Sequence, residues 1–394
     1  MVRIGIWLVA ALCLLPTSSR AQTSEDADFD GNGVVDYNDF LALARAFGAN
    51  SARFDLDRSG VVDFQDFVIF ARLYVQSADK SDQEPVVTEE AAGRVEVFDL
   101  PELGSRPYDI VVDARGIVWF TELGANRIGR FDPRTGTFAA YLLPIPGSQP
   151  LRIVVDSRGL IWFTQIGANR IGSLNPVSEE IREFVVPTPG SRPHGLAFDR
   201  RGVLWFTQES ANRIGRLNPL DGTFEAYLIP TPAAGVDGLL VDGEGALWFA
   251  ERAVGKLGRL DPVSLEIEEF GLSDEDLELR EIALDSGGRI WFTNTSTHGL
   301  SVFDPKTGNT TMYRPPDEVS DLYATVVDLG DRIWFAGRES NRIVRFDPEV
   351  GRFRLYPLQY SGAGVGHLTV DVLGVIWFTD PGKDRIGRVE DTGP

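Results

Sequence analysis

The most regular feature of the chain is a Trp-Phe pair that returns every 43 residues, seven times between residues 119 and 378. Each pair lies in a short apolar run, and three further short runs complete the repeat. In the first repeat the four runs are 110–112, 118–121, 127–131 and 137–142. Short runs rich in β-branched and aromatic residues, bounded by turn residues, predict four β-strands per repeat.

Turn residues separate these predicted strands at fixed positions. An Asp stands six residues before every Trp of the seven pairs, and a Gly stands three before in six of them. Asp-x-x-Gly between two apolar runs predicts a hairpin turn. An Asp-Pro or Asn-Pro turn precedes the fourth run in six repeats, and Asn-Arg precedes the third run in four. Because Asn-Arg repeats, we interpret it as a hairpin or inter-blade contact rather than as a binding motif.

Seven repeats of four strands predict an all-β fold, the seven-bladed β-propeller, over residues 94–394. An open solenoid would need capping repeats, which the sequence lacks. Segment 94–101 has the pattern of a fourth strand with no strand before it, and the last repeat stops after its third strand near residue 389. We therefore expect the N-terminal strand to complete the last blade, which hides both sheet edges.

The first 21 residues have the pattern of a secretory signal peptide. Arg3 precedes an apolar run from Ile4 to Leu15, and a small-x-small sequence ends at Ala21. We expect cleavage after residue 21 and export to the periplasm or the extracellular space. The run is too short for a comfortable membrane span, so we predict none. Cys13, the one cysteine, lies inside this segment, so the mature protein has no disulfide bond.

Two acidic loops follow the signal, 27 residues apart. Each has oxygen-bearing side chains at loop positions 1, 3, 5, 9 and 12, Gly at position 6 and a backbone carbonyl at position 7. One tight loop wraps calcium with this spacing. A solvated acidic stretch is the alternative, which two copies in register disfavour. The predicted ligands of two Ca²⁺ ions are Asp28, Asp30, Asn32, Val34, Asp36 and Asp39, then Asp55, Asp57, Ser59, Val61, Asp63 and Asp66.

Each loop runs into an amphipathic helical pattern, so we expect a small α-helical domain over residues 22–76 and a polar linker over 77–93. The apolar positions are Phe40, Leu41, Ala44 and Phe47, then Phe67, Phe70, Ala71 and Tyr74. A duplicated loop and exit helix resembles the type I dockerin modules, which are paired EF-hand modules of extracellular enzyme assemblies. The resemblance covers about residues 26–76 and implies a cohesin-like partner. It departs at loop positions 10 and 11, Tyr37-Asn38 and Phe64-Gln65, which in that family are usually small and hydroxylated and choose the partner.

Composition narrows the classes of partner. With 58 acidic and 38 basic residues the net charge is −20. Nucleic-acid affinity comes mostly from clustered Lys and Arg, so we expect no nucleic-acid partner. The same charge disfavours adsorption to anionic membranes. At 43% hydrophobic residues, the chain can bury a large core.

Positions that vary among the repeats are free to carry function. One such ring stands eleven residues before each Trp, at the start of the innermost strand, and should face one mouth of the central channel. A second ring stands three residues after each Trp. Repeats three to five hold the densest polar group in these rings, and a His beside carboxylates can act as a base or a metal ligand. A simply solvated channel is the alternative. The predicted catalytic residues are His194, Asp237 and Glu251, and the predicted ligand-binding residues are Tyr108, Arg280, Tyr323 and His367.

Three motifs of the third repeat resemble the virginiamycin B lyases, also called streptogramin lyases. They are Pro-Gly-Ser-Arg-Pro-His-Gly-Leu at 189–196, Arg-Gly-Val-Leu-Trp-Phe-Thr at 201–207 and Ala-Asn-Arg-Ile-Gly-Arg-Leu at 211–217. The resemblance extends over all seven repeats. It implies a seven-bladed propeller that opens a cyclic depsipeptide at its ester by elimination. It also implies a His base, nearby Glu residues and Mg²⁺ at the propeller channel.

The catalytic positions that the resemblance implies lie in the last two blades, and this chain departs from them. Tyr323 and Gly366 stand where the family has a His, Gly364 or Val365 stands where it has the first Glu, and Asp380-Pro381 lies near the second. His367 is one residue out of register. A one-residue slip turns a strand side chain to the other face, and a local bulge would restore it.

These patterns support three hypotheses. The leading one is an exported, calcium-binding propeller that binds a ligand or protein partner at its channel mouth. The alternative is a Mg²⁺-dependent carbon–oxygen lyase that opens a cyclic depsipeptide or lactone ester, with a rearranged site around His194, Asp237 and Glu251. The weakest is a polysaccharide enzyme using Glu122 and Asp380, which neighbouring blades would bring together on closure.

Overall fold

The computed structural model describes residues 27–29, 35, 37–81, 89–90, 93–272, 279–316, 319–337 and 340–391. The chain divides into two compact units, Met1–Gln83 and Glu84–Pro394. Predicted ligands Asp30, Asn32, Val34 and Asp36 of the first calcium loop, like the predicted signal peptide, lie outside the described residues.

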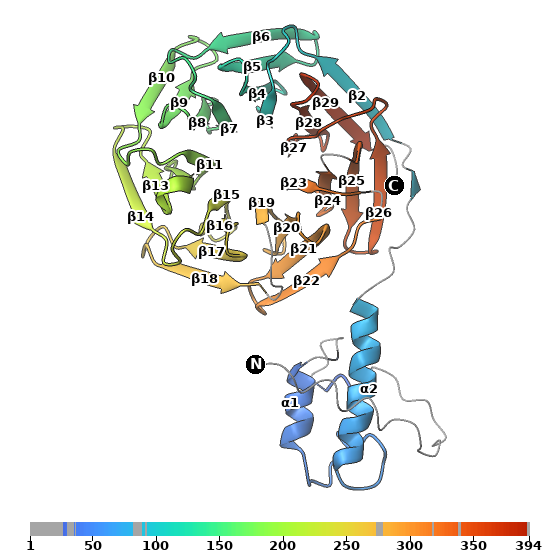
Figure 1. Ribbon diagram of the computed structural model, residues 1–394. Coiled ribbons are helices and arrows are strands. Elements are labelled where there is room, and N and C mark those ends of the chain that lie inside the picture. Colours follow the sequence, from blue (N-terminus) through green and yellow to red (C-terminus); the bar gives the residue numbers. More distant parts are fainter. Residues whose placement is uncertain are drawn as a thin grey trace. The chain divides into compact units, whose positions relative to one another are not determined.

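The second unit is a ring of seven antiparallel blades, in which the sheets follow one another around an axis (Figure 1). In every blade the first strand is the innermost and the fourth is the outermost. Blade one contains β3 (Pro107–Val112), β4 (Val118–Glu122), β5 (Arg127–Asp132) and β6 (Thr137–Leu142). Blade two contains β7 (Pro150–Val155), β8 (Ile161–Gln165), β9 (Arg170–Leu174) and β10 (Ile181–Val185). Blade three contains β11 (Pro193–Phe198), β12 (Leu204–Gln208), β13 (Arg213–Leu217) and β14 (Phe224–Leu228), with a 3₁₀ turn at Glu209–Ala211.

The remaining blades continue in chain order. Blade four contains β15 (Val236–Val241), β16 (Leu247–Glu251), β17 (Lys256–Leu260) and β18 (Ile267–Gly271). Blade five contains β19 (Leu279–Leu284), β20 (Ile290–Asn294), β21 (Gly299–Asp304) and β22 (Asn309–Tyr313). Blade six contains β23 (Leu322–Val327), β24 (Ile333–Gly337), β25 (Arg342–Asp347) and β26 (Arg352–Pro357). Blade seven contains β27 (Leu368–Val370), β28 (Ile376–Asp380), β29 (Arg385–Asp391) and β2 (Gly93–Asp99).

The ring closes as the sequence predicts, because strand β2 from the start of the unit completes the last blade. It pairs antiparallel with β29 over seven residues, from Gly93 opposite Asp391 to Asp99 opposite Arg385. A further short strand, β1 (Glu89–Glu90), lies within the predicted linker and pairs parallel with β26 on the outer edge of blade six. The seven-bladed, all-β prediction is confirmed, and the N-terminal segment also covers a second sheet edge.

The repeated Asp and Trp form one structural unit in every blade. All seven Trp indoles donate a hydrogen bond to the Asp six residues earlier, at 2.8 to 3.2 Å. The other oxygen of Asp113 accepts the backbone N–H groups of Arg115 and Ile117, which fixes the turn between the first two strands. Gly116 completes this turn at φ +78°. Fully burying an indole is favourable only when its N–H is bonded, and the Asp provides the acceptor.

The Asn of the repeated Asn-Arg motif ties the blade to the loop that leads to the next blade. Asn212 adopts φ +54°, donates to the carbonyls of Ile229 and Thr231, and accepts the N–H of Ala234. Asn126, Asn169 and Asn341 make the equivalent bonds. The motif is therefore structural, as its repetition indicates.

A Thr two residues after the Trp joins neighbouring blades close to the axis. Thr121 Oγ1 accepts the N–H of Asp109 at 3.0 Å and donates to the carbonyl of Leu151 in the next blade at 2.8 Å. In blade seven, Thr379 Oγ1 bonds the N–H of His367 and the carbonyl of Tyr108, at 3.0 and 2.8 Å. The latter bond closes the ring from blade seven to blade one.

The innermost strands of blades one to six contain a bulge near the residues that reach the axis. The register between β3 and β4 shifts between Pro107 and Ile110, and blades two to five repeat this shift. In blade six it falls between Leu322 and Ala324. A bulge re-aims side chains locally. As a result, the residues ten and eleven positions before the Trp both meet partners from other blades.

The described part of the N-terminal unit contains two helices, α1 (Tyr37–Arg45) and α2 (Phe64–Ser81). Its core includes Ala27, Phe29, Val35, Leu43, Leu56, Val62, Phe70 and Leu73. The predicted apolar face of the first helix was wrong by one position: Leu43 is fully buried, whereas Ala44 is exposed and Phe47, beyond the helix end, is 59% exposed. The second helix extends into the segment predicted as linker. None of the helices in the described ranges has the length and apolar content needed to span a membrane.

Candidate functional site

Side chains from all seven blades meet at the end of the ring axis where the innermost strands begin. They stand ten or eleven residues before the Trp of their blades. We call this group the axial cluster. Its members, in chain order, are Tyr108, Asp109, Arg152, His194, Asp237, Glu281, Tyr323 and His367.

Arg152 is the centre of the axial cluster and is 7% exposed. From β7 of blade two, its guanidinium reaches Asp237 of blade four, with Nη2 3.3 Å from Oδ1. The same Nη2 pairs with Glu281 of blade five, and Nη1 lies 2.9 Å from Nδ1 of His367 in blade seven. One side chain therefore links four blades across the axis.

The charges around Arg152 keep it protonated. Burial alone lowers the pKa of a guanidinium, but the carboxylates of Glu281 and Asp109 outweigh this effect and raise the pKa of Arg152 well above its ordinary value. For Asp109, the effect of burial on the pKa is larger than the effect of the neighbouring positive charge. Burial raises its pKa to about 6, although Arg152 and the N–H groups of Ile153 and Ile110 oppose the rise. The cluster therefore contains a permanent cation and a carboxyl group that titrates near pH 6.

His367 is 3% exposed and lies in the ring ten residues before the Trp. Its N–H bonds Thr379 as that of Asp109 bonds Thr121, so the predicted slip of register does not turn it away from the axis. Its ring packs on those of Tyr108 and Tyr323, with centroids 4.7 and 5.5 Å away. Because a guanidinium only donates, the His367 nitrogen that faces Arg152 accepts.

Tyr108 and Tyr323 meet across the axis from blades one and six, with their hydroxyl oxygens 2.6 Å apart. Burial and the neighbouring Tyr323 raise the pKa of Tyr108 far above its ordinary value. Both predicted ligand-binding tyrosines are thus members of the axial cluster and flank His367.

His194 and Asp237 form the pair that the sequence predicts, with Nδ1 2.9 Å from Oδ1. Their side chains are 12% and 9% exposed, so the pair borders the solvent. Arg252 Nε lies 3.9 Å from the other oxygen of Asp237, and Glu209 pairs with both Arg252 and Arg192. Nδ1 makes no hydrogen bond with a described residue, so the contact places a carboxylate beside the imidazole at ion-pair distance. An imidazole beside a carboxylate can act as a base.

Glu251, the third predicted catalytic residue, makes no hydrogen bond to His194 or Asp237 in the part of the chain that the structure describes. Its carboxyl group is fully buried beside Glu269 and Lys256, on the outer strands of blade four. Burial and the charge of Glu269 raise its pKa to about 7.

Three other side chains that stand three residues after the Trp also bond to residues outside the axial cluster. Glu122 pairs with Arg127 at 2.6 Å, Gln165 donates to Glu183, and Asp380 accepts from Tyr360. These side chains bond to outer strands or to loops between blades. The Glu122 and Asp380 pair considered for polysaccharide chemistry is therefore engaged in structural contacts.

Asp109, Arg152 and Glu281 were not among the predicted site residues, because the prediction considered the rings eleven residues before and three residues after the Trp. The neighbouring ring, ten residues before, carries Asp, Arg, Gly, Gly, Glu, Ala and His in blade order. The charged residues of this ring were the sequence signal that could have identified these site residues. Arg280 lies on β19 at the predicted position, but its side chain lies outside the described residues.

A separate acidic site lies in the N-terminal unit. Oxygen atoms of Asp55, Asp57 and Asp66 lie within 4.8 Å of one another. The N–H at loop position 2 donates to the Asp at position 12 in both loops, from Phe29 to Asp39 and from Leu56 to Asp66, each at 2.6 Å. The two loops therefore fold alike where they are described, and the donor set of the second suits Ca²⁺.

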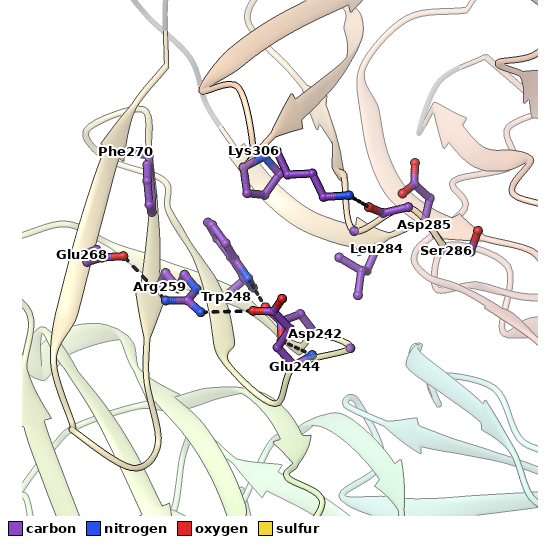
Figure 2. A pocket seen from close by; sticks show the side chains of 14 residues that line it. Asp242, Glu244, Trp248, Arg259, Glu268, Phe270, Leu284, Asp285, Ser286 and Lys306 are labelled. Atoms are coloured by element: carbon purple, nitrogen blue, oxygen red, sulfur yellow. Dashed lines mark hydrogen bonds and ion pairs between the residues drawn. The ribbon is translucent and has the colours of Figure 1, made fainter.

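A hollow of about 710 Å³ lies between blades four and five, at the opposite end of the strands from the axial cluster (Figure 2). Trp248, Phe270 and Leu284 line it, with Arg259 between Glu244 and Glu268 at 3.9 and 3.6 Å. None of the predicted catalytic residues lines it, so the axial cluster remains the candidate site.

Known proteins match both the sequence and the fold. The family model described as the virginiamycin B lyase family matches residues 80–323. A selenomethionine-substituted virginiamycin B lyase from Staphylococcus aureus is 27% identical with a TM-score of 0.70, and the alignment covers 75% of this chain and 99% of that one. A streptogramin B lyase structure is 29% identical with a TM-score of 0.72, covering 77% and 99%.

A third structure shows a relative with a bound compound. It is a catalytically inactive His-to-Ala variant of the S. aureus virginiamycin B lyase with quinupristin, 28% identical with a TM-score of 0.71, covering 75% of this chain and 99% of that one. Among curated proteins, none matches the chain. The family match ends at residue 323, within blade six, so it does not cover blade seven, where Gly366 and Asp380-Pro381 depart from the implied catalytic positions.

Proposed function

Because the chain belongs to the virginiamycin B lyase family, we propose that its propeller binds a small ligand at the axial cluster. The observation that carries this proposal is the convergence of polar side chains from all seven blades on one end of the axis. A fold that needed only packing would fill these positions with apolar residues, because buried charges are costly unless they are paired. Binding or catalysis is the usual reason to retain such groups.

The names of the similar structures suggest the class of ligand. Quinupristin accompanies one relative, so we propose a cyclic depsipeptide or a related lactone as the ligand here. Arg152 supplies positive charge, His194 lies at the edge of the cluster, and the half-buried Tyr108 ring offers aromatic surface. Ester carbonyls and aromatic groups of a depsipeptide match these features.

A carbon–oxygen lyase is the second candidate, and the contact between His194 and Asp237 favours it. His194 Nε2 would take the proton from the carbon next to a carbonyl. The electron pair left on that carbon forms a double bond, the ester C–O bond at the next carbon breaks, and the carboxylate leaves. The imidazole then passes the proton to the carboxylate or to water, so the neutral linear product has the mass of the cyclic substrate.

The two candidates are separated by incubating the full chain with quinupristin and following both binding and products. Calorimetry measures binding, and chromatography with mass detection measures products. Binding without a new product supports the ligand-binding function, and an isobaric linear product supports the lyase. A product heavier by one water would refute elimination, and absence of binding and of products would refute both candidates.

Two histidine variants form a matched pair for this experiment. We expect His194→Asn to lose turnover or weaken binding by at least about tenfold, since an amide cannot accept the proton. The control is His298→Asn. His298 is exposed in a turn of blade five at φ +52°, where other blades have Asn, so this change restores the repeat consensus and should alter neither quantity.

We also propose that the N-terminal unit binds two Ca²⁺ ions and that the protein is exported. The duplicated loop spacing and the converging oxygens of Asp55, Asp57 and Asp66 support calcium. A calcium titration of the full chain tests it: Asp55→Asn should abolish one of two binding events, while Glu225→Gln, an exposed change of equal charge on β14, should abolish neither. A single event in the unchanged protein would contradict the two-site proposal.

The loop-and-helix duplication supports a further role for this unit as a docking module for a cohesin-like extracellular protein. Export is tested by the mass of the protein recovered outside the cytoplasm, which should begin after residue 21. Docking is tested by pull-down with a cohesin in Ca²⁺ and in chelator. Capture in both conditions, or in neither, would contradict a calcium-dependent dock.

A further inference from the structure

The family resemblance implies Mg²⁺ at the propeller axis, and the donor groups of the axial cluster do not fit that ion. The axial carboxylates are Asp109, Asp237 and Glu281, from blades one, four and five. A metal site needs ligand atoms that converge on one point. Across the described parts of the chain, the group of His, Cys, Asp or Glu ligands that converges in this way is Asp55, Asp57 and Asp66, in the other unit.

The point toward which the axial carboxylates turn is already filled by a side chain. Arg152 Nη2 lies 3.3 Å from Asp237 and pairs with Glu281, and Asp109 is close enough for Arg152 to lower its pKa. The guanidinium is therefore surrounded by three carboxyl groups from three blades. Its own backbone is held in blade two by the bond from its N–H to Thr164, at 3.0 Å.

His367 supports the same conclusion. Its Nδ1 faces Arg152 at 2.9 Å and lies 3.8 Å from both Asp109 and Glu281. A metal ion would need the lone pair of this nitrogen, and the guanidinium N–H occupies it. The arrangement of imidazole and carboxylates that elsewhere would hold a divalent cation here holds an arginine.

We propose that the guanidinium of Arg152 is the resident cation of the axial site, in the place of the divalent metal that the resemblance implies. The site then binds oxygen-bearing ligands without a metal. The statement about ligand binding rests on the proposed function. The statement that Arg152 replaces the metal is tested without any ligand. Because an arginine cannot be removed by a chelator, the axial site keeps its charge under all metal conditions.

Thermal melting of the full chain tests the proposal. Trp7 lies in the predicted signal segment and the other seven Trp residues lie in the propeller, so Trp fluorescence of the mature chain reports the propeller alone. We expect the melting temperature of the unchanged protein to agree within about 1 °C in EDTA and in excess Mg²⁺ or Mn²⁺, since an ion that does not bind the native state cannot stabilise it.

Arg152→Met leaves the three carboxylates and His367 around an uncharged side chain. We expect this variant to melt several degrees lower in EDTA and to recover part of the loss in Mn²⁺, because the freed donors gain a cation. Arg152→Lys retains the charge and should show no such recovery. Arg182→Met, a change of the same kind at an exposed position on β10, should melt like the unchanged protein in every condition.

A rise in the melting temperature of the unchanged protein with Mg²⁺ or Mn²⁺ would overturn the proposal, whether or not the Arg152 variants fold. Loss of quinupristin binding in EDTA would overturn it as well. If quinupristin fails to bind in any condition while the melting results are as expected, the proposed ligand is wrong and the role of Arg152 stands.

Discussion

Replacing Glu251 by Gln should stabilise the propeller, and by an amount that depends on pH. Glu251 is fully buried, and neither of its carboxyl oxygens accepts a hydrogen bond from a described residue. Its neighbour Glu269 is held as a carboxylate by Thr231 and by Lys256, 3.1 Å away. Gln occupies the equivalent position in blades two and three, as Gln165 and Gln208, so the amide suits the repeat.

The size of the effect follows from the pKa of Glu251, which burial raises from 4.5 to about 7. A carboxyl group whose pKa is higher in the folded state stabilises the fold while it is protonated. That contribution is complete below pH 4.5 and is lost as the pH rises through 7. Glutamine carries no such dependence. We expect Glu251→Gln to be more stable than the unchanged protein by about 1 kcal/mol at pH 5 and about 3 kcal/mol at pH 8.

Urea denaturation followed by Trp fluorescence at pH 5 and pH 8 measures this difference for the propeller. Glu122→Gln is the matched control: Glu122 stands at the same ring position but pairs with Arg127 at 2.6 Å. Removing one partner of this buried pair should destabilise the fold by about 2 kcal/mol at both pH values. A Glu251→Gln variant with no pH-dependent gain would refute the conclusion that Glu251 is a buried, unsolvated acid.

Three further predictions concern the ring and the N-terminal unit, for which we propose calcium binding. Thr379→Val should lower the unfolding free energy by about 2 kcal/mol, because the bond to Tyr108 in blade one and the bond to His367 within blade seven are both lost. The exposed change Thr135→Val should alter it by less than about 0.5 kcal/mol in the same urea assay, and equal effects of the two changes would contradict the closing role of Thr379. Asn212→Ala should lower the unfolding free energy by about 2 kcal/mol, since the change leaves the carbonyls of Ile229 and Thr231 unpaired. A decrease below about 0.5 kcal/mol would contradict the structural role of this motif. Chelation of calcium should reduce helicity by circular dichroism and leave the Trp melting transition unchanged, and a shift of that transition would show that calcium acts on the propeller too.

The fold was predictable because the sequence repeats the same pattern of apolar runs and turn residues seven times. Each Trp carries its own acceptor six residues earlier, and the strand lengths follow from the turns that this Asp builds. Closure of the ring was predictable as well, because segment 94–101 has the pattern of a fourth strand with no strand before it. In the structure, β2 from this segment pairs with β29. These features depend on local patterns that recur in register.

The composition of the axial site was only partly predictable, because the bulge in the innermost strands is not visible in the alternation of residues. In blade two the register shift lies between Pro150 and Ile153, and Arg152 within it reaches the centre of the cluster. His367 meets Arg152 from the same ring position in blade seven. The partners of Glu251 were not predicted either. The position of Glu251 on its strand brings its carboxyl group to Glu269 and Lys256, and its charge alone does not reveal this. Long-range partners such as Glu281 for Arg152 follow only from the closed ring.

The central claim is that the axial cluster receives the ligand, and imidazole NMR of the full chain tests it most directly. The protein has three histidines: His194 and His367 belong to the axial cluster, and His298 is exposed in a turn of blade five. Addition of quinupristin to ¹⁵N-histidine-labelled protein should shift the resonances of His194 and His367 in proportion to saturation and leave His298 unchanged. A shift of His298 alone, or no shift of either axial histidine at saturating ligand, would contradict the account.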